Sequence, residues 1–178
     1  WMHQRFWHKD LRITVLDVGQ GSSTLMELPG GHNILVDGGG FSDNSAFDIG
    51  EKVIAPLLWR KKIKTIDTII LSHPNSDHLN GLLFIAKHFN VKTVLSNHQK
   101  TNTAGYREFL RIIKNRKTHH PDYESMRKEF SINDVKLQIL YPPVNFLQKM
   151  DQDNLHDSNN NSIVVKAEFG PISFLIPG

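Results

Sequence analysis

The order of the predicted strands and helices constrains the fold of this chain more than any other feature. Strands of alternating apolar and polar residues, separated by turns, are predicted at the start (11–18 and 23–28) and at the end (162–168 and 172–176). Between them, short apolar strands alternate with segments of helical spacing. Hairpins on either side of β-α units favour a layered α/β fold with mixed sheets over a purely parallel, doubly wound sheet.

The middle of the chain supplies the predicted helices. A buried-type strand at 68–71 is followed by a predicted helix at 79–88, and a basic amphipathic helix is predicted at 106–116. Residues 48–58 also have helical spacing, although Pro56 predicts a kink or a late helix start there. We therefore expect these helices to pack through apolar stripes against a sheet formed by the short strands.

Length and composition limit what the chain can form. With 178 residues it is long enough for one compact domain with a sizeable core, and we expect residues 1–178 to form a single domain. Because there is no cysteine, disulfides and thiolate zinc sites are excluded, and a metal would need imidazole, carboxylate, amide or water ligands. The ten histidines make metal chemistry worth testing, whereas the net charge of +3 only permits a polyanionic partner.

The densest cluster of chemically active residues follows the predicted strand at 68–71. His73, Asn75, Asp77 and His78 place two imidazoles, a carboxylate and an amide within six residues. Divalent zinc or manganese favours such nitrogen and oxygen donors, and a loop at a strand end can point several of them inward. The cluster therefore predicts a metal site, with an ordinary capped helix start as the alternative.

The same cluster carries a family resemblance. The run from His73 to His78 resembles the His-x-His-x-Asp-His motif of the metallo-β-lactamase superfamily, with Asn75 in place of the second histidine. Other segments fit the same family in order, and the first and third resemble the ComEC family more than true β-lactamases. These segments are 17–21, 35–39, 159–164 and 174–178. The resemblance implies an α/β fold, a metallo-β-lactamase-like αββα sandwich with mixed sheets.

The resemblance also implies roles for single residues. Asp77 and His78 are expected to ligate one metal together with an aspartate that would follow Gly178, while His73 serves a neighbouring position that Asn75 weakens. Asn160 is expected where the family has a third histidine, with Asn159 as a supporting residue or a substitute. The implied cofactor is a divalent metal, manganese or zinc, held as one ion or a labile pair.

Asp37 follows a predicted strand and precedes three glycines. It is expected either to orient a metal ligand from behind or to serve only as a turn residue.

The resemblance further implies a function. We expect phosphodiester hydrolysis, with Asp77 as the catalytic residue that orients the attacking water. In the ComEC family this domain belongs to a DNA-uptake channel. The implied partners are therefore single-stranded DNA and the transmembrane channel domain of a longer protein. This chain would be a fragment of that protein, truncated at its C-terminus. The implied activity is degradation of the strand that is not transported, on the extracytoplasmic side of the cell membrane.

Two other functions stay open at this stage. One alternative is a catalytically impaired module that binds or guides single-stranded DNA, because histidines of the family motif are replaced. A stand-alone hydrolase of small esters or thioesters is a further alternative, which the asparagine-rich segment at 159–161 argues against.

Basic residues and other histidines are less informative. Two groups of basic residues are candidates for phosphate contacts or for an ordinary solvated surface. They are Arg60, Lys61, Lys62 and Lys64, and then Arg107, Arg111, Lys114 and Arg116. His88, His98, His119 and His120 have no carboxylate neighbours at ligand spacing, and the sequence assigns them no role.

Overall fold

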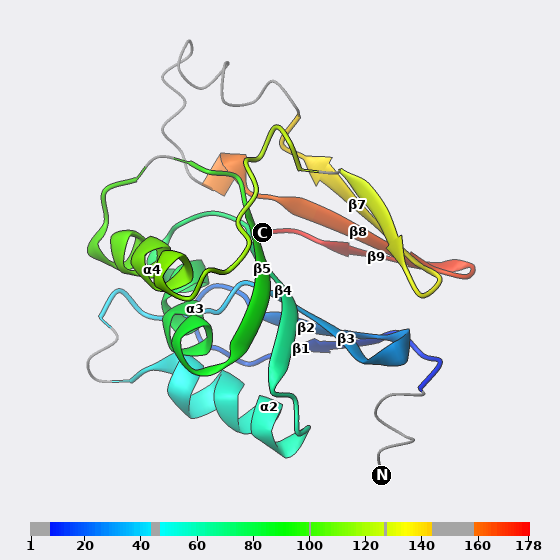
Figure 1. Cartoon of the computed structure of the whole chain (residues 1–178), viewed down its shortest axis with the longest axis horizontal. Helices are drawn as coiled ribbons and strands as arrows, with labels where there is room; N and C mark the ends of the chain where they lie inside the picture. Colours follow the sequence, from blue (N-terminus) through cyan, green and yellow to red (C-terminus); the bar gives the residue numbers. More distant parts are fainter. Residues whose placement is uncertain (1–7, 44–46, 100, 127, 144–158) are drawn as a thin grey trace.

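The computed structural model of the chain describes residues 8–43, 47–99, 101–126, 128–143 and 159–178 (Figure 1). The first sheet contains β1 (Arg12–Val15), β2 (Thr24–Leu28), β3 (His32–Val36), β4 (Thr65–Leu71) and β5 (Asn90–Ser96). The second contains β6 (Glu129–Ile132), β7 (Val135–Tyr141), β8 (Val164–Phe169) and β9 (Ile172–Ile176). The helices are η1 (Pro29–Gly31), η2 (Gly50–Ile54), α2 (Ala55–Arg60), α3 (Ser76–His88), α4 (Ala104–Asn115) and η3 (Asn159–Asn161).

The first sheet is mixed, as the sequence predicted. Strands β1 to β3 form an antiparallel meander, and β3, β4 and β5 pair in parallel. Because parallel strands end at the same edge of a sheet, the residues after β3, β4 and β5 meet there. These residues begin with Asp37, Ser72 and Asn97. The topology thus brings the predicted metal cluster and Asp37 together.

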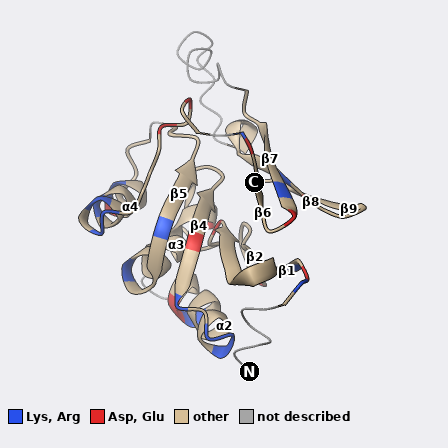
Figure 2. Ribbon diagram, turned by 45° about the vertical axis from the view of Figure 1, so that its right-hand side comes forward, with Lys and Arg blue, Asp and Glu red and all other residues tan. Residues whose placement is uncertain are grey.

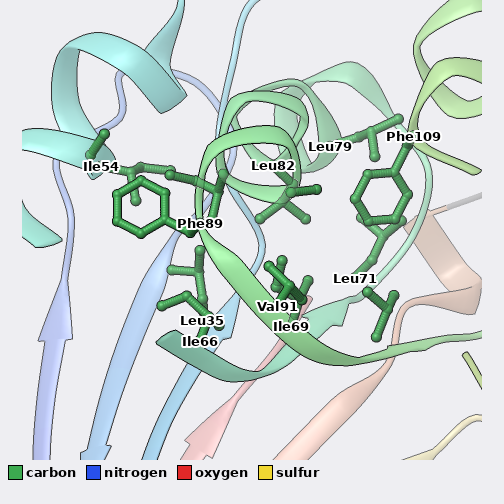
Figure 3. Packing of buried hydrophobic residues seen from close by; sticks show 14 of the residues in the cluster. Leu35, Ile54, Ile66, Ile69, Leu71, Leu79, Leu82, Phe89, Val91 and Phe109 are labelled. Atoms are coloured by element: carbon green, nitrogen blue, oxygen red, sulfur yellow. The ribbon is translucent and has the colours of Figure 1, made fainter. Parts of the chain in front are cut away.

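Each face of the first sheet carries its own hydrophobic cluster. Ile69 and Ile70 are neighbours on β4 and face different clusters, as expected from the alternation of side chains along a strand. One cluster packs the sheet against α2, α3 and α4, where Leu82 and Phe109 contribute (Figure 3). The other lies between the two sheets and includes Leu137 of β7. The first sheet is therefore covered on both faces.

The second sheet has a different outer face. There, Lys136 pairs with Glu129 at 3.1 Å and Lys166 pairs with Glu168 at 2.6 Å, on the side opposite to the buried Leu137. The helices of the described segments lie over the first sheet, and none of their α-helices covers this outer face (Figure 1). A face built from ion pairs suits contact with water.

The element predictions were largely confirmed, although the helical segment around Pro56 differs in detail and one strand was missed. Pro56 lies in the first turn of α2, directly after the π-helical turn η2, so the helical segment begins before the proline and changes from π- to α-helical geometry there. The strand β6 was missed, although its alternating sequence is joined to β7 by Asn133 and Asp134, which both have positive φ as a tight hairpin turn requires. The polar loop predicted at 151–161 lies outside the described residues up to 158.

None of the helices in the described ranges has the length and apolar character that crossing a lipid bilayer demands.

Candidate metal centre

The predicted metal cluster is assembled where β4 ends and α3 begins. Asn75 has extended backbone angles at the N-cap of α3, so the chain turns between His73 and the first helical turn. His73, Asp77 and His78 each offer a ligand atom within 4.8 Å of the others, and the two imidazole centroids are 4.0 Å apart. A tetrahedral zinc ion about 2.1 Å from each ligand atom holds neighbouring donors about 3.4 Å apart. These three residues can therefore hold a metal ion after a small closing movement.

Asp37 holds His78 from behind. Its carboxylate is fully buried and accepts hydrogen bonds from the Ser72 amide at 2.8 Å, the Ser72 hydroxyl at 2.7 Å and the Ser22 hydroxyl at 3.2 Å. The Nδ1 atom of His78 lies 2.8 Å from the same carboxylate. With Nδ1 engaged, Nε2 is the nitrogen left to bind a metal, and a carboxylate behind it fixes the tautomer that this requires.

His73 presents one nitrogen toward the site. Its Nδ1 lies 3.0 Å from the hydroxyls of both Ser72 and Ser162. Its Nε2 is buried and has no hydrogen-bond partner within the described part of the chain. A buried polar atom without a partner is costly, and a bound cation would remove that cost. The donor set of this site thus fits a divalent metal.

Close backbone contacts lock α3 against the loop after β3. The Gly38 amide donates to the His78 carbonyl at 2.7 Å, and the Gly81 amide donates to the Gly39 carbonyl at 3.0 Å. A Cβ atom on Gly38 would come within 2.5 Å of the Leu82 amide nitrogen, so only glycine fits there. This close contact fixes the position of α3, and therefore of His78, relative to Asp37.

The two imidazoles have opposite protonation tendencies. Burial alone lowers the pKa of His78, but the hydrogen bond and charge of Asp37, aided by Asp77, outweigh it and raise the net pKa above its ordinary value. Burial, reinforced by the nearby His78, lowers the pKa of His73. His73 is therefore the imidazole held in its neutral, metal-binding form.

The predicted asparagines lie at the rim of the site. The Asn75 amide donates to the Asn159 side-chain oxygen at 2.9 Å, which joins the loop after β4 to η3. Asn160 is exposed beside it. The structure thus brings Asn75 and Asn159 together next to the three metal-binding candidates, and metal ligation by Asn75 or Asn160 stays a prediction.

Sequence reasoning missed the serines that hold the site. Ser22, Ser72 and Ser162 come from three distant segments and contact either Asp37 or His73. Ser72 and Ser162 lie beside motifs that the sequence had singled out, which was the only available signal. Ser22 had the same indirect signal, since it directly follows the segment at 17–21.

A hollow of about 430 Å³ opens next to Asp77. The loop from Pro74 to Asp77 forms one side, and the start of α4 from Thr103 to Gly105 forms the other. The Asp77 side chain is 42% exposed, so it can reach both a metal ion and a molecule in this hollow.

The basic residues fall into two groups that lie apart (Figure 2). The group at 60–64 lies where α2 leads into β4, at the opposite end of that strand from the metal cluster. Seven residues of β4 separate the two ends, which is about 20 Å. On α4, Arg107 donates to Asn102 and Arg111 pairs with Glu108. Only the α4 group is on an element that borders the candidate site.

Comparison with known proteins identifies the family. The sequence profile described as the Metallo-beta-lactamase superfamily matches residues 16–145, well over half of the chain, including the run from His73 to His78. The chain belongs to the metallo-beta-lactamase superfamily. The predicted α/β fold with mixed sheets is thereby confirmed, and the superfamily includes many hydrolases.

Two curated relatives place the resemblance within the superfamily. ComE operon protein 3 of Bacillus subtilis is 26% identical over 186 residues, covering 93% of this chain. Recombination protein 2 of Haemophilus influenzae is 28% identical over 167 residues, covering 94% of this chain. Both are ComEC-family proteins, as the sequence motifs predicted. The chain spans only 22% and 18% of the length of these relatives.

Solved structures support the fold alone. The diiron β-hydroxylase CmlA of Streptomyces venezuelae aligns with a TM-score of 0.50 at 18% identity, covering 93% of this chain and 29% of CmlA. The metallo-beta-lactamase fold protein YhfI of Bacillus subtilis gives a TM-score of 0.50 at 14% identity, covering 92% of this chain and 61% of YhfI.

Proposed function

We propose that this domain is a divalent-metal-dependent nuclease that hydrolyses phosphodiester bonds of DNA within a ComEC-type DNA-uptake protein. The observation that supports the reaction best is the convergence of ligand atoms from His73, Asp77 and His78, together with the buried Nε2 of His73, which has no hydrogen-bond partner among the described residues. Resemblance to ComEC-family proteins, one of them named Recombination protein 2, favours DNA as the substrate.

Each residue of the site has a distinct part in this proposal. His73, Asp77 and His78 hold the cation, and Asp37 keeps His78 in the tautomer that binds it. The chemistry that a divalent cation supplies at such a site is polarisation of a phosphoryl oxygen and acidification of water. The exposed oxygen of Asp77 accepts a hydrogen bond from the attacking water and orients it toward the phosphorus. The hollow beside Asp77 receives the scissile phosphodiester.

The metal content is proposed to be one ion or a labile pair, of manganese or zinc. Asn75 replaces a histidine of the family motif, and a neutral amide oxygen binds a divalent cation less strongly than an imidazole. The Asn75 amide also donates to Asn159, so ligation by its oxygen leaves that bond intact. Asn160 is a further candidate ligand at the same rim.

The proposal is tested with single-stranded DNA and added Mn²⁺ or Zn²⁺. Asp77→Asn should lower the cleavage rate by about 100-fold or more, since both a ligand charge and the water-orienting oxygen are lost. Asp10→Asn, which changes a carboxylate that is 72% exposed, is the matched control and should cleave at the normal rate. Cleavage that needs no metal, or that survives Asp77→Asn, would disprove the proposed mechanism.

A second candidate function is a DNA-guiding module without catalysis. The hydrogen bond between Asn75 and Asn159 favours it. Asn75 stands where the family motif has its second histidine, and Asn159 lies in the segment where the family has a third histidine ligand. The same experiment separates the two functions. A guiding module would bind single-stranded DNA and leave it intact at every metal concentration.

The cellular setting is also part of the proposal. The relatives are about five times longer than this chain, and we propose that the domain belongs to a membrane protein, with the domain on the extracytoplasmic side and the channel as its partner. Protease treatment of intact spheroplasts should degrade the domain in the full-length protein. Protection of the domain until the cells are lysed would place it on the other side.

A further inference from the structure

A second hollow, of about 530 Å³, lies between the segment after β5 and the helix α4. This volume is within the usual range for small-ligand pockets. Its walls combine flat or apolar side chains with amides. They include His98, His120, Tyr106, Leu110, Gln99 and Asn102.

Two histidines form an aromatic surface in this hollow. The rings of His98 and His120 stack with centroids 4.3 Å apart and planes 11° from parallel. Each ring is held by one nitrogen, since His120 Nε2 lies 2.9 Å from the Ser96 hydroxyl and His98 Nε2 lies 2.8 Å from the Pro121 carbonyl. The stack is therefore fixed before any ligand arrives, which reduces the entropy lost on binding.

His120 is electrically neutral at ordinary pH. Burial, together with the nearby His98, lowers the pKa of His120 to about 4. A neutral imidazole offers a π-face for stacking, in contrast to a charged ring, which would favour an anion. Gln99 and Asn102 add amide donors and acceptors of the kind that bind the edges of planar heterocycles.

The hollow is adjacent to the candidate metal centre. Ser96, which contacts His120, pairs across the sheet with Leu71, directly before Ser72 and His73. The start of α4 separates the two hollows, because Thr103 to Gly105 line the one beside Asp77 and Asn102 and Tyr106 line the other. Arg107, which is exposed and donates to Asn102, adds a cation at this boundary.

We propose that the hollow lined by His98 and His120 is a nucleobase subsite, which stacks one unpaired base of the nucleic-acid substrate next to the metal centre. This inference rests on the proposed function for its substrate class. A base in this hollow would leave the sugar-phosphate backbone near Arg107 and the start of α4, toward the hollow beside Asp77. Recognition by stacking requires an unpaired base and tolerates any sequence.

Binding without metal tests the subsite apart from catalysis. A fluorescein-labelled hexadeoxyadenylate and an abasic strand of the same length are titrated in EDTA and followed by anisotropy. His120→Ala should weaken binding of the base-bearing strand by about tenfold, as expected for loss of one base-aromatic contact, and leave the abasic strand unchanged. His120→Phe, which retains a ring, should bind like the natural chain.

Further variants guard against a folding artefact. Thr101→Trp fills the hollow and keeps both histidines, so it should show the same loss for the base-bearing strand alone. Equal losses for both strands, or no loss for either, would overturn the subsite. Failure of the proposed function would look different: metal-dependent cleavage would be absent, while His120→Ala would still weaken binding of the base-bearing strand and not of the abasic strand.

Discussion

The molecule contains two pairs of contacting imidazoles that differ in what surrounds them. The rings of His73 and His78 are tilted by 47° and lie between the carboxylates of Asp37 and Asp77. The rings of His98 and His120 are nearly parallel, and their described hydrogen-bond partners are a carbonyl and a hydroxyl. Contact between two histidines is therefore no sign of a metal site by itself. A carboxylate within hydrogen-bond distance of one ring distinguishes the pair that suits a cation.

The largest difference between the two pairs should appear in metal binding. His78→Ala removes a proposed ligand and should weaken binding of Mn²⁺ or Zn²⁺ by more than about 100-fold, because even the residues behind a ligand contribute about 10–100-fold. His120→Ala removes an imidazole of the other pair and should leave the affinity unchanged. Isothermal titration of each purified variant measures both values, and equal affinities for the two variants would remove the distinction.

A smaller effect is expected from the carboxylate behind His78. Asp37→Asn keeps the shape of the side chain but removes the charge that orients the imidazole, and should weaken metal binding by about 10–100-fold. Asp67→Asn is the matched control, since Asp67 is also buried and accepts hydrogen bonds from Asn33 and Lys92 near the opposite end of β4. Similar losses of metal affinity in both variants would mean that Asp37 acts only through general stability.

The smallest expected effect is a difference in pH dependence. The pKa of His120 falls to about 4 in the folded chain, so the unfolded chain takes up a proton first as the pH drops. Its contribution to stability is fully present above the ordinary histidine pKa of about 6.5 and is lost between about pH 6.5 and 4. After allowance for its partial exposure, the loss is about 1–2 kcal/mol. Urea unfolding of His120→Phe should show a correspondingly shallower loss of stability over this range.

The pair of His73 and His78 should show the opposite pH dependence of stability. The raised pKa of His78 means that the charge contribution of its contact with Asp37 is fully present below about pH 6.5 and is lost as the pH rises through the folded pKa. In metal-free protein, His78→Gln should therefore lower the free energy of unfolding most at acidic pH and progressively less toward alkaline pH. If His78→Gln and His120→Phe altered the pH dependence of the free energy of unfolding in the same direction, the opposite pKa shifts of His78 and His120 would be contradicted.

The sequence predicted the residues that lie close together along the chain better than those that support them. The run from His73 to His78 lies between a strand and a helix, and both were recognisable from apolar periodicity. The role of Asp37 stayed open because its hydrogen bonds to Ser72 and His78 depend on how β3 pairs with β4, which periodicity does not specify. The stack of His98 and His120 was not predicted, since 21 residues separate the two rings.

The three candidate ligands lie within six consecutive residues, whereas their supports come from segments as distant as Ser22 and Ser162. An unfolded chain thus still carries both imidazoles and the carboxylate at short spacing, and it would retain some affinity for the cation. Binding of the cation to the unfolded chain offsets part of the stability that its binding gives to the folded domain. The cation should consequently raise the melting temperature by less than its affinity for the folded domain implies.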